Sequence, residues 1–113
     1  MHELSIAQAV VRTVCDTLAA NGRSRASRIR LEVGKFTAVV PDALSSAFEW
    51  VSRGTACEGA ALEIEEIPVR LKCEDCQSEF TLEELDLLCP NCQSRRVRIT
   101  SGRELLIKSV EAE

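Results

Sequence analysis

The sequence predicts an α/β protein of the α+β type, with two helices, a small mixed sheet of about three strands and an inserted cysteine-rich module. Two segments repeat apolar residues with the 3.6-residue period of a helix, and other segments alternate apolar and polar residues as strands do. Four cysteines form two Cys-x2-Cys pairs separated by twelve residues. With 113 residues, the chain can build one modest core beside such a module.

The first predicted element is a helix near the start of the chain. It is expected to end near Asn21 and Gly22, which tolerate the left-handed turn that closes a helix. Its start is expected either near residue 2 or at a capping box formed by Ser5 and Gln8. The apolar residues that define its buried face are Leu4, Ala7, Val11, Val14 and Leu18.

The middle of the chain is expected to add a strand, a second helix and another strand. Residues 28–33 alternate apolar and charged side chains, which predicts a strand with one exposed face. Pro41 suits the first turn of a helix that runs to Val51. In the next strand the alternation slips at Glu65 and Glu66, which predicts a β-bulge there.

The four paired cysteines are the clearest candidate site. A two-residue gap lets both thiolates of a pair turn toward one point, and two pairs complete a tetrahedron, which suits zinc. Four thiolates leave no position for water, so the zinc is expected to be structural. Iron in a rubredoxin-like site and a redox dithiol are weaker alternatives. The predicted zinc ligands are Cys73, Cys76, Cys89 and Cys92.

The two remaining cysteines are not assigned a function. Cys15 lies beside the apolar face of the first helix and is interpreted as a buried thiol. Cys57 lies in a segment with turn composition and is interpreted as an incidental residue.

The last apolar run, residues 105–110, is interpreted as a strand that needs a partner. The cysteine module has too little apolar content to shelter it, so it is expected to pair with the earlier strands. The sequence therefore predicts an α/β domain of residues 1–69, completed by residues 101–113, and an inserted zinc-binding ribbon domain of residues 70–100. No internal repeat is predicted.

Composition and charge argue against several classes of protein. A net charge of −4 argues against a general polyanion binder. No segment has the roughly 18 apolar residues of a membrane helix, and no signal segment opens the chain, so a cytoplasmic location is expected. The chain has no phosphate-binding glycine loop, no dinucleotide fingerprint and no histidine besides His2, so it is not expected to be an enzyme.

The N-terminus is a second candidate site because His2 follows Met1 directly. A free amine at Met1, the imidazole of His2 and the backbone nitrogens between them can form fused chelate rings on one ion, which suits Ni(II) or Cu(II). The first amides of a helix lack an acceptor four residues back, so their use breaks no helical hydrogen bond. The positive end of a helix nevertheless disfavours a cation, so the residues alone leave this site open.

The opening Met1-His2-Glu3-Leu4-Ser5, together with the two cysteine pairs that follow the Ile67-Pro68 segment, resembles the HypA/HybF family of nickel metallochaperones of NiFe-hydrogenase maturation. The resemblance covers nearly the whole chain. It implies that Ni2+ is a transported cargo held by the amine of Met1, the imidazole of His2 and backbone nitrogens of His2 and Glu3. A role for the Glu3 carboxylate is left open.

The resemblance also implies partners. Nickel would pass, together with a HypB-type GTPase, to the precursor of the hydrogenase large subunit, without a nucleic-acid or membrane partner. The alternative is a zinc-ribbon interaction module that binds protein or nucleic acid without nickel. Arg95, Arg96 and Arg98 favour it slightly, but Phe80 is the only aromatic residue of the module, which leaves little surface for stacking on bases.

Overall fold

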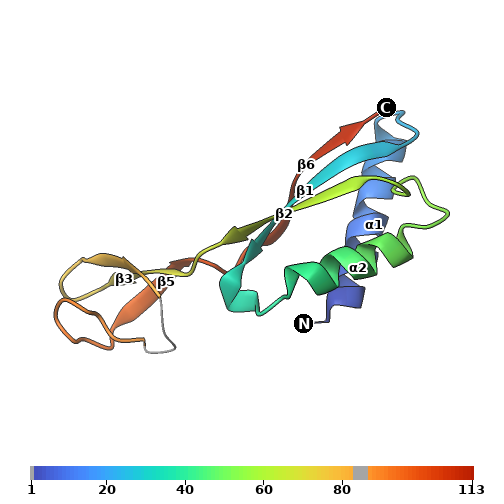
Figure 1. Ribbon diagram of the computed structural model, residues 1–113. Helices are drawn as coiled ribbons and strands as arrows, with labels where there is room; N and C mark the ends of the chain where they lie inside the picture. The colour runs from blue at the N-terminus through green and yellow to red at the C-terminus, as the bar shows by residue number, and fades with distance from the viewer. Residues whose placement is uncertain (1, 83–86) are drawn as a thin grey trace.

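The computed structural model describes residues 2–82 and 87–113 and shows an elongated molecule, 54 × 25 × 16 Å along its principal axes (Figure 1). At one end, the helical lobe contains α1 (Glu3–Ala20), α2 (Pro41–Val51) and three strands. At the other end, the ribbon lobe contains three short strands and the paired cysteines. The predicted α+β fold, with two helices, a small mixed sheet and a cysteine ribbon, is confirmed.

The sheet of the helical lobe has β1 (Ala26–Gly34) at its centre, between β2 (Ala61–Ile67) and β6 (Leu105–Ala112). Strand β2 runs parallel to β1, and β6 runs antiparallel to it. The parallel pair is connected through α2, because parallel strands need a crossover. The last strand of the chain therefore returns to the first, as its apolar run predicted.

The predicted bulge at Glu65 and Glu66 is wrong. Strand β2 pairs with β1 without a register shift over its whole length. Glu66 is exposed and Ile67 is half-buried at the end of the strand. The break in the apolar–polar alternation therefore corresponds to two successive exposed glutamates near the end of the strand, and not to an inserted residue.

A β-bulge does occur in β6. The neighbours Arg30 and Leu31 of β1 pair with Ser109 and Ile107, which makes Lys108 an extra residue. Because of this extra residue, apolar side chains on both sides of the bulge pack against the same core.

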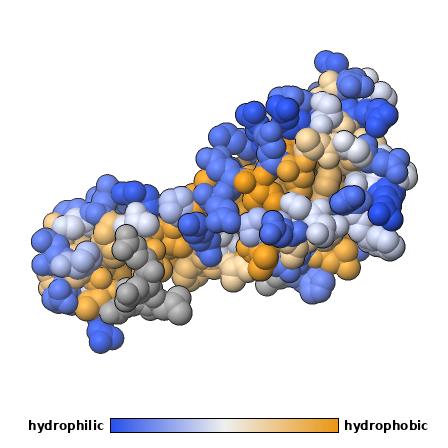
Figure 2. All heavy atoms as spheres, viewed as in Figure 1, coloured by the Kyte–Doolittle hydropathy of each residue, from blue (hydrophilic) through white to orange (hydrophobic). Residues whose placement is uncertain are grey.

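The core lies between the helices and the one face of the sheet that they both cover (Figure 1). In the space-filling view, hydrophobic residues are visible in both lobes, and hydrophilic residues cover the outer ends of the molecule (Figure 2). No helix in residues 2–82 and 87–113 is long and apolar enough to cross a membrane. The buried residues that α1 contributes to the core are Ile6, Ala7, Val10, Val11, Val14 and Leu18.

The ribbon lobe is built on β3 (Arg70–Cys73), which lies between β4 (Glu79–Thr81) and β5 (Val97–Ser101). Both neighbours run antiparallel to β3. Between these strands, two loops carry the four paired cysteines.

The two lobes meet at two glycines in close contact. A β-carbon on Gly34 would overlap the carbonyl group of Gly102, and a β-carbon on Gly102 would lie 2.7 Å from the Cα atom of Val69. Gly102 also has a φ of +107°, which disfavours any other residue. The N–H of Gly34 donates to the carbonyl of Glu104 at 2.6 Å, and the N–H of Phe36 donates to the carbonyl of Gly102 at 2.9 Å. The connection between the lobes is therefore a hydrogen-bonded crossing and not a free linker.

Candidate metal centres

The ribbon lobe brings the four predicted zinc ligands together. The Sγ atoms of Cys73 and Cys92 are 3.5 Å apart, and those of Cys76 and Cys89 are 3.6 Å apart. All four sulfur atoms lie within 4.8 Å of one another. Four sulfurs at about 2.3 Å from a zinc ion would be roughly 3.8 Å apart, so the cluster fits a tetrahedral zinc thiolate site. The described ranges contain no other group of three or more metal-ligating side chains this close together.

Each cysteine pair belongs to the same six-residue motif, Cys-x-x-Cys-Gln-Ser, at residues 73–78 and 89–94. In both copies the N–H of the first cysteine donates to the serine carbonyl at 2.9 Å. The N–H of Gln77 and of Gln93 closes each loop on the carbonyl of the first cysteine, at 3.0 and 2.9 Å. These glutamines also share a positive φ, 65° and 64°. The chain therefore contains a short internal repeat that was not predicted, although the Gln-Ser after each pair was a visible signal.

The two cysteine loops are connected by reciprocal side-chain contacts. Asn91 of the second loop donates to the hydroxyl of Ser78 in the first loop at 3.2 Å. Asp75 of the first loop accepts a hydrogen bond from the hydroxyl of Ser94 in the second. Asp75 also forms a 2.8 Å ion pair with Arg96. These contacts connect the two loops beside the four sulfur atoms.

The surroundings of Cys76 favour its thiolate. Hydrogen bonds from Ser78 and Asn91 lower the pKa of Cys76 to about 5. The Ser78 Oγ atom lies 3.2 Å from Cys76 Sγ. Because zinc binds cysteine as thiolate, this environment prepares one ligand for metal binding.

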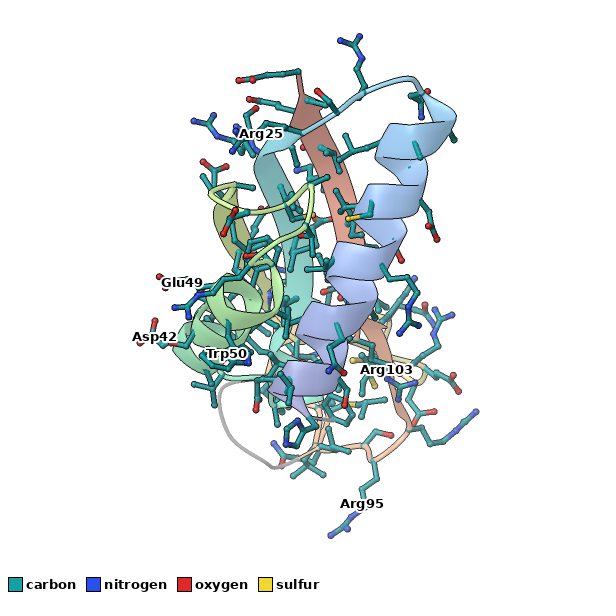
Figure 3. All side chains as sticks on the ribbon, turned by 90° about the vertical axis from the view of Figure 1, so that its right-hand side faces the viewer. Arg25, Asp42, Glu49, Trp50, Arg95 and Arg103 are labelled. Carbon is teal, nitrogen blue, oxygen red and sulfur yellow. The ribbon has the colours of Figure 1, made fainter. Side chains whose placement is uncertain are left out.

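Two basic residues of the ribbon lobe, Arg95 and Arg96, have different surroundings. Arg96 is engaged with Asp75 and lies 3.6 Å from the carboxylate of Glu74. Arg95 extends away from the ribbon into solvent (Figure 3). The arrangement therefore adds little to the alternative of a nucleic-acid interface.

The second candidate centre lies at the start of α1. Met1, a predicted nickel ligand, lies outside the described residues. His2 is exposed and caps the helix, because its Nδ1 atom accepts a hydrogen bond from the N–H of Leu4 at 3.2 Å. The helix begins at Glu3, so of the two predicted starts the one near residue 2 is correct and the capping box is not formed.

Glu3 connects the first turns of the two helices. Its Oε2 atom accepts a hydrogen bond from the N–H of Val40 at 3.2 Å, and Val40 is the N-cap of α2. The pKa of Glu3 is lowered, mainly by this hydrogen bond and then by one from its own backbone. The carboxylate therefore has structural partners, and the N–H of Glu3 has no carbonyl four residues back to which it could donate.

The structure also brings together two cysteines that are far apart in sequence. The Sγ atoms of Cys15 in α1 and Cys57 in the turn before β2 are 4.0 Å apart. Cys57 is fully buried, so its interpretation as an incidental residue is wrong, and Cys15 is half-buried. Burial raises the pKa of the Cys57 thiol to about 12.

The fold and the four-cysteine centre define a small metal-binding protein, in which a helix-covered sheet carries an inserted zinc-ribbon module. A family model described as "Hydrogenase/urease nickel incorporation, metallochaperone, hypA" matches residues 1–112. The chain belongs to the HypA family of nickel metallochaperones, and the resemblance seen in the sequence is confirmed.

Related proteins align with this chain over its full length. The hydrogenase maturation factor HypA of Desulfitobacterium hafniense is 41% identical over 113 residues, which cover 100% of this chain and 99% of that protein. The corresponding protein of Nostoc sp. is 44% identical over 113 residues, covering 100% of this chain and 96% of that one. The solution structure of the Ni metallochaperone HypA from Helicobacter pylori matches with a TM-score of 0.68 and 30% identity, covering 99% and 97% of the two chains.

Proposed function

We propose that this chain binds Ni(II) at its N-terminus and delivers it for assembly of the hydrogenase active site, while the ribbon lobe holds one structural Zn2+. Membership of the HypA family supports the carrier role. The observation that carries the nickel site is the position of His2, which is exposed as the N-cap of α1 and directly follows Met1 in the sequence.

The proposed nickel ligands are the amine of Met1, the imidazole of His2 and the backbone nitrogens of His2 and Glu3. The amides at the start of a helix have no carbonyl four residues back, so they are available without loss of a helical bond. In the structure, Nδ1 of His2 accepts a hydrogen bond from the N–H of Leu4. Nickel bound through Nδ1 would take the place of this hydrogen bond. Binding therefore exchanges one helix cap for a metal bond, at a cost of about 1 kcal/mol for the cap.

The proposal excludes the Glu3 carboxylate from the ligands. This carboxylate already accepts a hydrogen bond from the N–H of Val40. Its negative charge also stabilises the positive N-terminal ends of both helices. An exposed site at the end of a chain suits transfer, because the ligands of an acceptor can replace its own one at a time.

We further propose two domains, residues 1–69 with 101–113 and residues 70–100. Cys73, Cys76, Cys89 and Cys92 fill a tetrahedron without a free position, which supports a structural zinc. In isolated finger peptides, structural zinc contributes on the order of 10 to 16 kcal/mol. The zinc therefore supplies the ribbon domain with stability that its few apolar residues cannot.

The proposed partners are a HypB-type GTPase and the precursor of the hydrogenase large subunit. We propose that the chain acts in the cytoplasm and has no catalytic activity of its own. Its family and the occupied Arg96 both favour this role over a nucleic-acid-binding ribbon.

Nickel titration tests the first site. Zinc-loaded native protein is compared by calorimetry with His2→Ala and with a variant carrying one extra residue before Met1. Both variants should bind nickel at least 10-fold more weakly, and the Glu3→Gln control should bind like the native protein. Acid should release nickel, because the amine and the imidazole must lose their protons to bind. Native affinity in the extended protein would rule out the terminal chelate.

Zinc analysis tests the second site. The native protein should purify with close to one zinc per chain, and Cys73→Ala should lose it. Proteolysis should then cut within the ribbon lobe while the helical lobe survives. Retention of zinc and of protease resistance in Cys73→Ala would contradict the proposed ligand set.

A further inference from the structure

The pair formed by Cys15 and Cys57 lies outside both proposed metal centres. Their sulfur atoms are 4.0 Å apart although 42 residues separate them in sequence. Cys15 comes from the middle of α1, and Cys57 from the segment between α2 and β2. Both side chains belong to the hydrophobic core or its edge.

We propose that Cys15 and Cys57 form a disulfide when the protein meets a peroxide, and that this disulfide fastens α1 to the α2–β2 segment. A disulfide requires sulfur atoms about 2.05 Å apart, so the two must approach by roughly 2 Å. Rotation of side chains already in contact supplies such a movement with little change of the backbone.

The difference in exposure sets the order of the reaction. Cys15 is half-buried, so a peroxide reaches its sulfur first, whereas Cys57 is fully enclosed. The sulfur of Cys15 attacks one peroxide oxygen and breaks the O–O bond, and the departing hydroxide takes the proton of the Cys15 thiol, which gives a sulfenic acid and one water. The sulfur of Cys57 then attacks Cys15 Sγ, and the hydroxyl leaves with the proton of the Cys57 thiol as a second water. In total, two thiols are oxidised and hydrogen peroxide is reduced to two waters.

The fixed position of Cys57 helps the second step. The N–H of Cys57 donates to the hydroxyl of Thr55 at 3.1 Å, and that hydroxyl donates to the carbonyl of Ser52 at 2.6 Å. These hydrogen bonds tie the turn that carries Cys57 to Ser52 at the C-terminal end of α2.

The disulfide would act as a reversible constraint. It closes a loop that contains β1 and α2, two of the elements that form the core of the helical lobe. In the chain-entropy treatment, a loop of this length corresponds to a rise in the thermal midpoint on the order of 10 °C. A dithiol reductant reopens the bond by thiol–disulfide exchange.

Tryptic mapping after peroxide treatment tests the proposal. Trypsin separates Cys15, in residues 13–23, from Cys57, in residues 54–70, and leaves all four zinc cysteines in residues 73–95. Zinc-loaded protein treated with hydrogen peroxide should yield 13–23 linked to 54–70, with the loss of two hydrogens. Its melting midpoint should rise, and dithiothreitol should reverse both changes.

The matched variant is Cys15→Ala, which places a good helix former at a half-buried position of α1. It should show no linked peptide and no rise of the melting midpoint with peroxide. The proposal is overturned if native protein keeps the two peptides separate, with free thiols or added oxygen, while residues 73–95 become oxidised. It is equally overturned if Cys15→Ala shows the same peroxide-dependent rise.

Discussion

Asn91 and Ser78 belong to different cysteine loops, yet the Asn91 amide donates to the Ser78 hydroxyl at 3.2 Å. A second hydrogen bond joins the same two loops, because the Ser94 hydroxyl donates to the carboxylate of Asp75. Each loop therefore braces the other around the four sulfur atoms.

This bracing should control how fast zinc leaves. Asn91→Ala removes one contact between the loops and one hydrogen bond that favours the Cys76 thiolate, so transfer of zinc to a chelator should become roughly tenfold faster. A chromogenic chelator measures the rate. Arg98→Ala, an exposed substitution on β5, serves as the control and should leave the rate unchanged. Equal rates for native protein and Asn91→Ala would show that the contact does not restrain the metal.

Glu3 should stabilise the protein in a pH-dependent way. Its pKa is lowered in the folded state from the ordinary 4.5, mainly by the hydrogen bond from Val40. The stabilisation is therefore fully present above pH 4.5 and is lost as the pH falls through the lower folded pKa. Because the Glu3 side chain is only partly buried, the effect on the melting temperature should be no more than about 3 °C.

Melting curves of native protein and Glu3→Gln at several pH values check this. The two midpoints should differ above pH 4.5 and converge in stronger acid. Glu49→Gln, on the outward face of α2 (Figure 3), is the control for loss of a carboxylate. A difference that grows on acidification would reverse the predicted sign.

The glycine contact between the lobes should be intolerant of a methyl group. Gly34→Ala would place a β-carbon against the backbone of Gly102, which is unable to move away, and should cost about 3 kcal/mol of unfolding free energy. Gly22→Ala is the informative comparison. Gly22 has a φ of +66° but open space around it, so alanine there should cost only about 1 kcal/mol. Denaturant titration gives both values, and equal losses would mean that the close contact is not the limiting factor.

Removal of residues 103–113 should destabilise the helical lobe and not merely shorten the chain. The truncation deletes β6, exposes one edge of β1 and uncovers the core beside Leu105 and Ile107. The thermal midpoint of zinc-loaded protein should fall by more than about 10 °C. Deletion of Glu113 alone removes only its two backbone hydrogen bonds, with Ser24 and Arg25, and should have a much smaller effect. An unchanged midpoint in the longer truncation would contradict the role of β6.

Local spacing explains which features could be predicted from the sequence. The apolar face of α1 and the paired cysteines depend on residues a few positions apart, so their geometry follows directly from the chain. The bulge was placed in β2 instead of β6 because a break in alternation also arises at a strand end that is exposed on both faces. Sequence alone does not distinguish a bulge from an exposed strand end, because the outcome depends on which part of the sheet α1 and α2 cover.

Individual side-chain contacts between distant segments could not be predicted, although the return of β6 to the earlier strands was. Nothing in the order of residues indicates that Cys15 would meet Cys57, or that Glu3 would accept a hydrogen bond from Val40. Both depend on how α1 lies beside α2 and the following turn, which is a property of the assembled core. The repeated Gln-Ser after each cysteine pair is different, because that pattern was present in the sequence and was overlooked.

The ribbon lobe could be replaced by a short connection, because the strands before and after it lie close together near the end of β1. Strand β2 ends at Ile67 and β6 begins at Leu105, and both strands lie beside the end of β1 at Gly34. Two strand spacings separate them, about 10 Å, which three or four extended residues can span. A gene in which a short turn replaces the ribbon would therefore keep every strand pairing of the helical lobe. In topological terms, the ribbon lobe occupies the place of a short connection between the two edge strands that flank β1, and exchanging it would leave the helical lobe unchanged.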